Sequence, residues 1–226
     1  MKKIVILLLL SLSLISCSKK HEIVKEINSF SDINELFQLK NYKTQIKMYV
    51  NDSTDHVTAQ WDNFTLTGNL DTKMNAKTGI WSLKNKINTK EIQIDYIAFD
   101  KNDVFKNQII FKEHNKIDSS VSKFFIIKNK TENELAMKFF SPSMRDEISK
   151  RAKIIYTIHQ NREEIKTDSI VYDNLKGGKY SAVIKYNFKK GDDVSGYFSE
   201  IVMAKSPMDK DSLTMGNNSM YFIEKF

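Results

Sequence analysis

The chain has very little cysteine, proline or glycine. Cys17 is the single cysteine among 226 residues, and there are only two prolines and seven glycines. One cysteine excludes an intramolecular disulfide and every cysteine-rich zinc motif. The fold must therefore be held by its hydrophobic core, and its turns must use Asn and Asp more than Pro and Gly. Hydrophobic residues make up 41% of the chain and aromatic residues 11%, which is enough for such a core.

Signatures of catalysis and metal binding are also missing from the sequence. No histidine has the HxH or HExxH spacing of a zinc site, and no GxSxG elbow presents a serine nucleophile. The adjacent carboxylates Glu163-Glu164 and Asp192-Asp193 do not converge, because neighbours on a strand point to opposite faces. We therefore predict no catalytic residue, no metal site and no cofactor. This prediction covers all four histidines, which are His21, His56, His114 and His159.

The net charge is positive, and lysine supplies nearly all of it. The formal charge is +7 at neutral pH. The only arginines are Arg145, Arg151 and Arg162. Proteins that read nucleic acids favour Arg, because its planar group contacts phosphate and guanine through two hydrogen bonds. The composition therefore argues against a nucleic-acid partner.

The first sixteen residues have the pattern of a secretory signal peptide. Met1-Lys2-Lys3 provides a basic start, and residues 4–14 form an apolar run interrupted only by serines. That run has about eleven residues, roughly half of what an untilted membrane helix needs. We therefore predict that residues 1–16 are a leader that is removed before Cys17.

The residues Leu14-Ile15-Ser16-Cys17 resemble the lipobox of bacterial lipoproteins. This resemblance implies that signal peptidase II cuts before Cys17. It also implies that the Cys17 thiol carries diacylglycerol and that the new amino group is acylated, as with palmitate. Two or more acyl chains hold a protein stably on a membrane. Ser18 stands where an Asp favours inner-membrane retention, so the resemblance implies a lipid-anchored protein of the cell envelope, at the outer membrane.

Beyond the leader, the sequence predicts a mainly β fold of antiparallel sheets. Apolar and polar residues alternate in many short segments separated by polar turns, which is typical of sandwiches and open barrels. We divide the mature chain into a lipidated tether at 17–40, an N-terminal β module at 41–128 and a C-terminal β module at 129–226. The C-terminal module is expected to be an immunoglobulin-like sandwich. A single continuous sheet is the alternative.

Three local predictions accompany this division. Ser31 is expected to begin a short helix in the tether. The polar run 129–133 is predicted to be the domain boundary, since it separates two apolar strands. The segment 144–152 has helical character.

Two strand patterns are informative. Ile46 and Met48 face one way while Lys47 and Tyr49 face the other, which predicts a half-buried strand. In residues 56–70 the apolar parity slips, and a bulge near Asp62-Asn63 would reconcile the two halves.

One short segment resembles a known repeat. The run from Lys77 to Leu83 contains Gly79-Ile80-Trp81, which resembles the G-x-W core of MORN-type repeats. The Tyr that usually precedes this core is replaced by Lys77, and no second G-x-W follows at a fixed period. The resemblance implies one inherited β-hairpin and no MORN-like lipid-binding role.

The aromatic residues come from several predicted strands, and most must lie in the core. Trp81 and Phe198 are expected to be partly exposed, because neighbours of the opposite parity already supply apolar partners. They form our candidate binding patch for a protein or a glycan.

The overall style of the chain resembles uncharacterised lipoproteins of the Bacteroidota. It is rich in Lys, Asn and Ile, predicted to be β-rich, and cysteine-free after Cys17. Members of that group carry O-glycans at Asp-Ser/Thr followed by an aliphatic residue, Met or Thr. The resemblance implies candidate glycosylation sites in or beside predicted turns, at Ser53, Ser169 and Ser212.

Three functions are compatible with these observations. The first is a non-enzymatic envelope lipoprotein that binds a protein or glycan or assists an envelope assembly. The second is a hydrolase of envelope glycans or peptides with a site built from distant residues. The third is a purely structural envelope protein. An exposed aromatic patch without a polar cleft favours the first over the second.

Overall fold

The computed structural model describes residues 30–173, 177–206, 208–209 and 212–226. The chain divides into two units, one ending at Leu36 and the other covering Phe37–Phe226. In the first unit, helix α2 (Phe30–Leu36) confirms the short helix predicted in the tether. Ile33 and Leu36 lie three residues apart and are both buried. Cys17 and the predicted leader lie outside the described residues.

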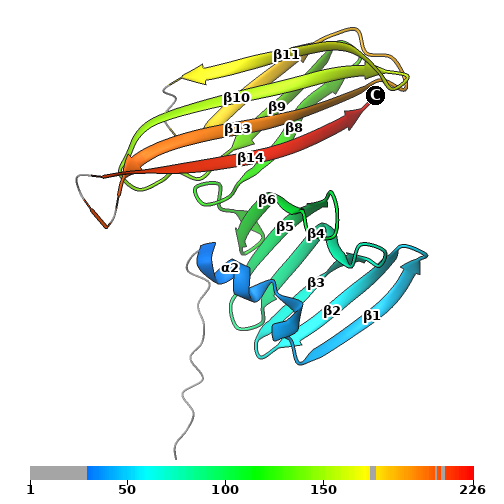
Figure 1. Ribbon diagram of the computed structural model, residues 1–226, viewed down its shortest axis with the longest axis vertical. Coiled ribbons are helices and arrows are strands. Elements are labelled where there is room, and N and C mark those ends of the chain that lie inside the picture. The colour runs from blue at the N-terminus through cyan, green and yellow to red at the C-terminus, as the bar shows by residue number, and fades with distance from the viewer. Residues whose placement is uncertain (1–29, 174–176, 207, 210–211) are drawn as a thin grey trace, which may run out of the picture. The chain divides into compact units, whose positions relative to one another are not determined.

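The second unit begins with a short 3-10 turn, η1 (Leu39–Asn41), and an antiparallel sheet of seven strands. The strands follow one another in chain order, so each pairs with its neighbours in the sequence (Figure 1). Their bounds are β1 (Thr44–Asn51), β2 (Thr54–Trp61), β3 (Phe64–Asp71), β4 (Ala76–Asn85), β5 (Lys90–Ala98), β6 (Val104–Glu113) and β7 (Lys116–Ile117).

The two faces of this sheet differ sharply in polarity. On one face Leu66, Leu83 and Ile92 are paired across β3, β4 and β5, and all three are buried. On the other face a polar row includes Thr67, opposite Ser82 on the next strand. Only one face therefore contributes to a hydrophobic core, as expected for an antiparallel sheet.

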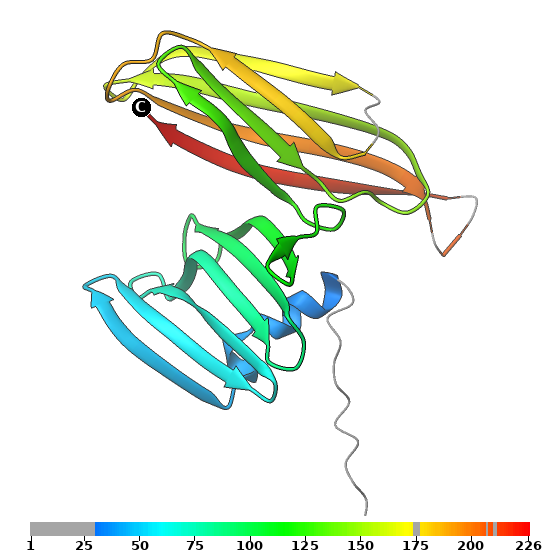
Figure 2. The ribbon, with the colours of Figure 1, turned by 180° about the vertical axis from the view of Figure 1, so that it is seen from behind.

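The remaining long strands form two further antiparallel sheets, with the orders β11-β10-β13-β14 and β12-β9-β8 (Figures 1 and 2). One buried cluster joins them, and within it the rings of Phe139 on β9 and Phe198 on β13 are stacked 5.0 Å apart. The predicted mainly β, antiparallel fold with a sandwich-like C-terminal part is therefore confirmed. The bounds are β8 (Phe124–Thr131), β9 (Glu134–Phe140), β10 (Glu147–Gln160), β11 (Glu163–Asp173), β12 (Lys179–Lys185), β13 (Asp193–Lys205) and β14 (Leu213–Lys225).

The structure differs from two local predictions, the domain boundary at 129–133 and the bulge near Asp62-Asn63. Asn129 lies inside β8, and the polar run ends in the turn of the β8–β9 hairpin, so it is not a linker. The change of sheet comes earlier, between Ile117 and Phe124. Likewise Asp62-Asn63 is a hairpin turn between β2 and β3, with Asp62 at φ +47, and it is not a bulge within one strand. Polar runs occur both in hairpin turns and in connections between sheets, so composition alone cannot distinguish the two.

The predicted helix at 144–152 is also wrong. The strand β10 begins at Glu147 and pairs with β13 on one side and β11 on the other. Lys150, Ala152 and Ile154 alternate into the interior along it. Helix propensity differs by less than about 1 kcal/mol per residue, and burial of a central strand outweighs it.

The side chains of Asn107 on β6 and of Lys123, which lies between β7 and β8, form hydrogen bonds with the backbone of β14. The Asn107 amide on β6 accepts from the Tyr221 N–H at 2.6 Å and donates to the Tyr221 carbonyl at 3.0 Å. Lys123 Nζ donates to the carbonyls of Ser219 and Lys106, at 2.9 and 2.8 Å. Burial, with repulsion from Lys106, lowers the pKa of Lys123 to about 8. Part of the β14 edge is thereby hydrogen-bonded, which protects it from pairing with another strand.

Candidate functional site

The structure places both residues of the predicted binding patch in the interior. Trp81 and Phe198 are each 0% exposed, so the expectation of partial exposure is wrong. The Trp81 ring lies flat against the backbone of Gly68, where an added Cβ would come within 2.2 Å of the ring. Its indole N–H donates to the carbonyl of Asn69 at 2.9 Å. Phe198 packs between Phe139 and Tyr180.

The three candidate glycosylation serines have different surroundings. Ser53 lies in the β1–β2 turn, where its hydroxyl contacts the side-chain oxygen of Asn51 at 3.2 Å. Ser169 is exposed and lies within β11. Ser212 precedes β14 and donates to the carbonyl of Asp209 at 3.2 Å. Glycosylation of these residues stays a prediction.

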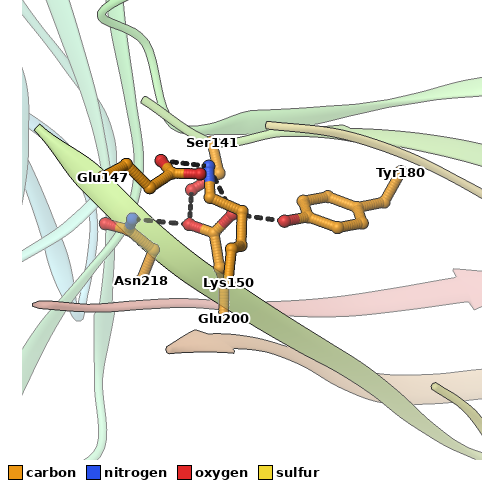
Figure 3. Close-up of polar contacts among 6 residues, drawn as sticks. All are labelled: Ser141, Glu147, Lys150, Tyr180, Glu200 and Asn218. Carbon is orange, nitrogen blue, oxygen red and sulfur yellow. Dashed lines mark hydrogen bonds and ion pairs between the residues drawn. The ribbon is translucent and has the colours of Figure 1, made fainter. Parts of the chain in front are cut away.

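The most polar part of the interior surrounds Glu200 on β13. We call Ser141, Glu147, Lys150, Tyr180, Glu200 and Asn218 the Glu200 network (Figure 3). The Glu200 carboxylate, 0% exposed, accepts hydrogen bonds from Tyr180 at 2.5 Å, from the Asn218 amide at 2.9 Å and from the Ser141 hydroxyl. Burial, followed by the hydrogen bond to Glu200, raises the pKa of Tyr180.

Lys150 supplies the positive charge of this network. Its Nζ lies 2.9 Å from a carboxylate oxygen of Glu147 and 3.5 Å from one of Glu200, and the Lys150 side chain is 1% exposed. Neither contact has the geometry of a hydrogen bond, so Lys150 interacts with the two carboxylates through ion pairs. The network joins the two C-terminal sheets, because Tyr180 belongs to β12 while Lys150, Glu200 and Asn218 belong to β10, β13 and β14.

This closed arrangement has the features of a structural network. The Ser141 hydroxyl contacts a carboxylate that already accepts two other hydrogen bonds, and Ser141, Lys150 and Glu200 are all buried. A nucleophilic serine needs a base that is free to take its proton and an approach for substrate. The sequence did contain a signal for this network: Lys150 and Glu200 occupy inward positions of otherwise apolar alternations on β10 and β13.

One groove that opens to solvent lies on the outer face of the four-stranded sheet. We call it the Tyr221 groove; it has a volume of about 340 Å³ and is lined mainly by Ile155, Tyr197, Tyr221, Ile223 and Phe99. Phe99 is 55% exposed and its ring meets that of Tyr221 edge-on, at 5.7 Å. The ring centres of Tyr197 and Tyr221 are 4.7 Å apart. The volume is at the small end of ligand pockets, which span about 300–1,000 Å³.

The groove offers few hydrogen-bonding groups to a ligand. The Tyr197 hydroxyl donates to the Ser219 hydroxyl at 2.6 Å, and the Thr157 hydroxyl contacts that of Thr167 at 2.8 Å. What remains is largely carbon surface. A sugar ring needs several directed hydrogen bonds, whereas an apolar side chain needs only contact area.

A second unusual cation lies on the buried face of the seven-stranded sheet. Lys77 on β4 donates a hydrogen bond to the carbonyl of Phe37. Its Nζ lies 4.6 Å from the ring centre of Trp81, 5.3 Å from that of Tyr96 and 5.5 Å from that of Phe37. Burial, with repulsion from Lys106, lowers the pKa of Lys77 to about 7.

Within the described residues, no three His, Cys, Asp or Glu side chains come together to hold a metal ion. In the same part of the chain, no helix has the length and hydropathy needed to span a bilayer. Comparison of the sequence with known protein families and with curated proteins found no match.

Proposed function

We propose that this chain is a lipid-anchored protein of the cell envelope that binds a protein partner through the Tyr221 groove and catalyses no reaction. The observation that carries the proposal is the exposed aromatic surface around that groove, formed by Phe99, Tyr197 and Tyr221. The Glu200 network is buried and its polar groups contact one another, so it does not support the alternative of a hydrolase. A purely structural role has no observation in its favour.

The chemistry of the groove favours an apolar side chain of a protein as its occupant. Ile155 is paired with Tyr197, and Ile223 follows Tyr221 by two residues on β14; they are 39% and 66% exposed. Exposed apolar patches that include Tyr rings are typical of protein contact sites. The hydroxyls of Tyr197 and Thr157 are already hydrogen-bonded within the chain, so they are less available to a glycan.

The anchor is tested by replacing Cys17 with serine. Without a thiol the chain cannot form a thioether with diacylglycerol. It loses about 0.8 kcal/mol of membrane affinity for each methylene that is no longer buried. We expect the wild-type chain to sediment with membranes and Cys17→Ser to move to the soluble fraction. Intact-mass measurement of the wild type should show the added acyl mass. Membrane sedimentation of the variant, or an unmodified wild-type mass, would contradict the anchor.

The groove is tested with two matched isoleucine variants in the full chain. Ile223 lines the groove, whereas Ile201 lies on the same sheet outside it and is 46% exposed. After cross-linking in the native envelope, we expect Ile223→Asp to lower recovery of the partner at least about tenfold, equivalent to 1.4 kcal/mol. Ile201→Asp should leave recovery within about twofold of the wild type.

Equal recovery from both variants would reject the groove as the binding site. Hydrolysis of cell-wall glycan or peptide by the purified full chain, with recovery unchanged, would favour the hydrolase instead.

A further inference from the structure

The first strand of the seven-stranded sheet is exposed on both faces. β1 is the terminal strand of that sheet, and among the described strands it pairs only with β2. All eight of its residues are exposed, in contrast to the alternating burial of β2 and β3. Such a strand presents a row of backbone N–H and C=O groups that can pair with another strand.

The apolar side of β1 lies on the wrong face for the core of its own sheet. Lys47 is paired with the buried residue Val57, whereas Met48 is paired with His56 and Ile46 with Thr58. Ile46 and Met48 are each 55% exposed, beside a face that is otherwise polar. The sequence pattern of a half-buried strand is therefore present, but among the described residues none covers its apolar side.

We propose that β1 pairs with β1 of a second copy of this chain, antiparallel, about a two-fold axis at Met48. An antiparallel strand pair is self-complementary under such an axis. Met48 then faces Met48 of the second copy on the polar face of the sheet. Ile46 faces Val50, which is 53% exposed. The apolar residues of one copy thereby lie against those of the other.

Charge selects this register over its neighbour. With the axis at Met48, Lys47 lies opposite Tyr49 of the second copy, and the Tyr49 hydroxyl donates to the Asp52 carboxylate at 2.7 Å. A cation beside an aromatic ring and a carboxylate is favourable. An axis one residue earlier would place Lys47 directly opposite Lys47, and like charges facing each other destabilise a sheet. The central lysine thus disfavours the register whose axis lies at Lys47.

The proposed contact between the two β1 strands is small. β1 contributes eight residues, whereas a standard interface has about 20–30 residues on each side. The dimer is therefore weak in free solution, and a covalent trap is needed. The proposal does not depend on the lipid anchor or on the Tyr221 groove.

The test is a pair of cysteine variants of the full chain. Opposite residues of antiparallel strands have Cα atoms about 4.5–5.5 Å apart, within the range of a disulfide. Met48→Cys should therefore cross-link on mild oxidation. Ile46→Cys should not, because the register puts the two Ile46 positions four residues apart, about 13 Å along the strand. The wild-type chain, with Cys17 alone, is the background control.

We expect Met48→Cys to form a covalent dimer at least about tenfold faster than Ile46→Cys. Sedimentation of the wild type at increasing concentration should show mass rising towards a dimer. The double change Ile46→Lys, Met48→Lys should keep the mass at one chain, with an unchanged circular dichroism spectrum. Equal cross-linking of the two cysteine variants would overturn the proposal. So would a wild-type chain that stays monomeric while the β1 amides resist hydrogen exchange, since another segment would then occupy the edge.

Discussion

Replacing Glu200 by alanine is expected to lower the free energy of unfolding by about 3–5 kcal/mol, the usual cost of breaking a buried ion pair from one side. The Glu200 carboxylate accepts from Ser141, Tyr180 and Asn218, and it lies 3.5 Å from the Lys150 ammonium. Without it, three donors and one charge are left in a site closed to water. The measurement is urea unfolding of the full chain, followed by circular dichroism.

Two further variants make this result interpretable. Glu200→Gln keeps an acceptor but removes the charge, and we expect a loss of about 1–3 kcal/mol. Glu200→Leu combined with Lys150→Met removes the buried Glu200–Lys150 pair and leaves the Glu147 carboxylate, whose side chain is 20% exposed, without its cation. The double variant should recover part of the loss, because an apolar pair of similar volume is often neutral in stability. Glu163→Ala, at an exposed position of β11, is the control and should stay within about 0.5 kcal/mol of the wild type. A loss below about 1 kcal/mol for Glu200→Ala would mean that the network does not hold the sheets together.

Replacing Lys77 by methionine is expected to stabilise the protein at pH 7 and to remove a rise in stability at alkaline pH. Burial holds the pKa of Lys77 at about 7 in the folded chain, against 10.5 in the unfolded chain. Between these two values the unfolded chain binds more protons, so stability increases with pH. Below pH 7 both states are protonated, and the cost of burying the ammonium is fully present.

The size of the effect follows from the same pKa difference. Each unit corresponds to about 1.36 kcal/mol. The fall from 10.5 to about 7 therefore corresponds to a cost of about 4–5 kcal/mol below pH 7. We expect the stability difference between Lys77→Met and the wild type to fall to near zero by pH 10.5. Urea unfolding at several pH values measures it.

The control for Lys77 is Lys73→Met. Lys73 is exposed in the turn before β4, so this change removes a lysine without relieving any burial. Its difference from the wild type should not vary with pH. If Lys77→Met behaves in the same way, the Lys77 ammonium is solvated in the folded chain and its pKa is ordinary.

The strand segments were predictable because alternation is a local property of the chain. Tyr180, Ala182 and Ile184 alternate with polar residues, and all three are buried in β12. Ile92 and Ile94 behave in the same way on β5. The antiparallel arrangement follows from the short turns between such segments.

The sheet boundaries were not predictable from composition. A polar run marks the β8–β9 hairpin at 129–133, and the change of sheet between Ile117 and Phe124 is no more polar than that hairpin. Which strands share a sheet depends on pairing between distant segments, such as β10 with β13. The local sequence does not determine which distant strands pair.

The sequence by itself determined the absence of disulfides, the alternating strands and the prediction of a lipidated Cys17. Only the tertiary structure decided which faces are covered. It buried Trp81 against Gly68 and Phe198 between the two C-terminal sheets, and it left Ile46 and Met48 of β1 exposed. The physical reason is that alternation assigns each residue to one of two faces, whereas burial of a face depends on what packs against it. The closed Glu200 network and the open Tyr221 groove follow from that packing.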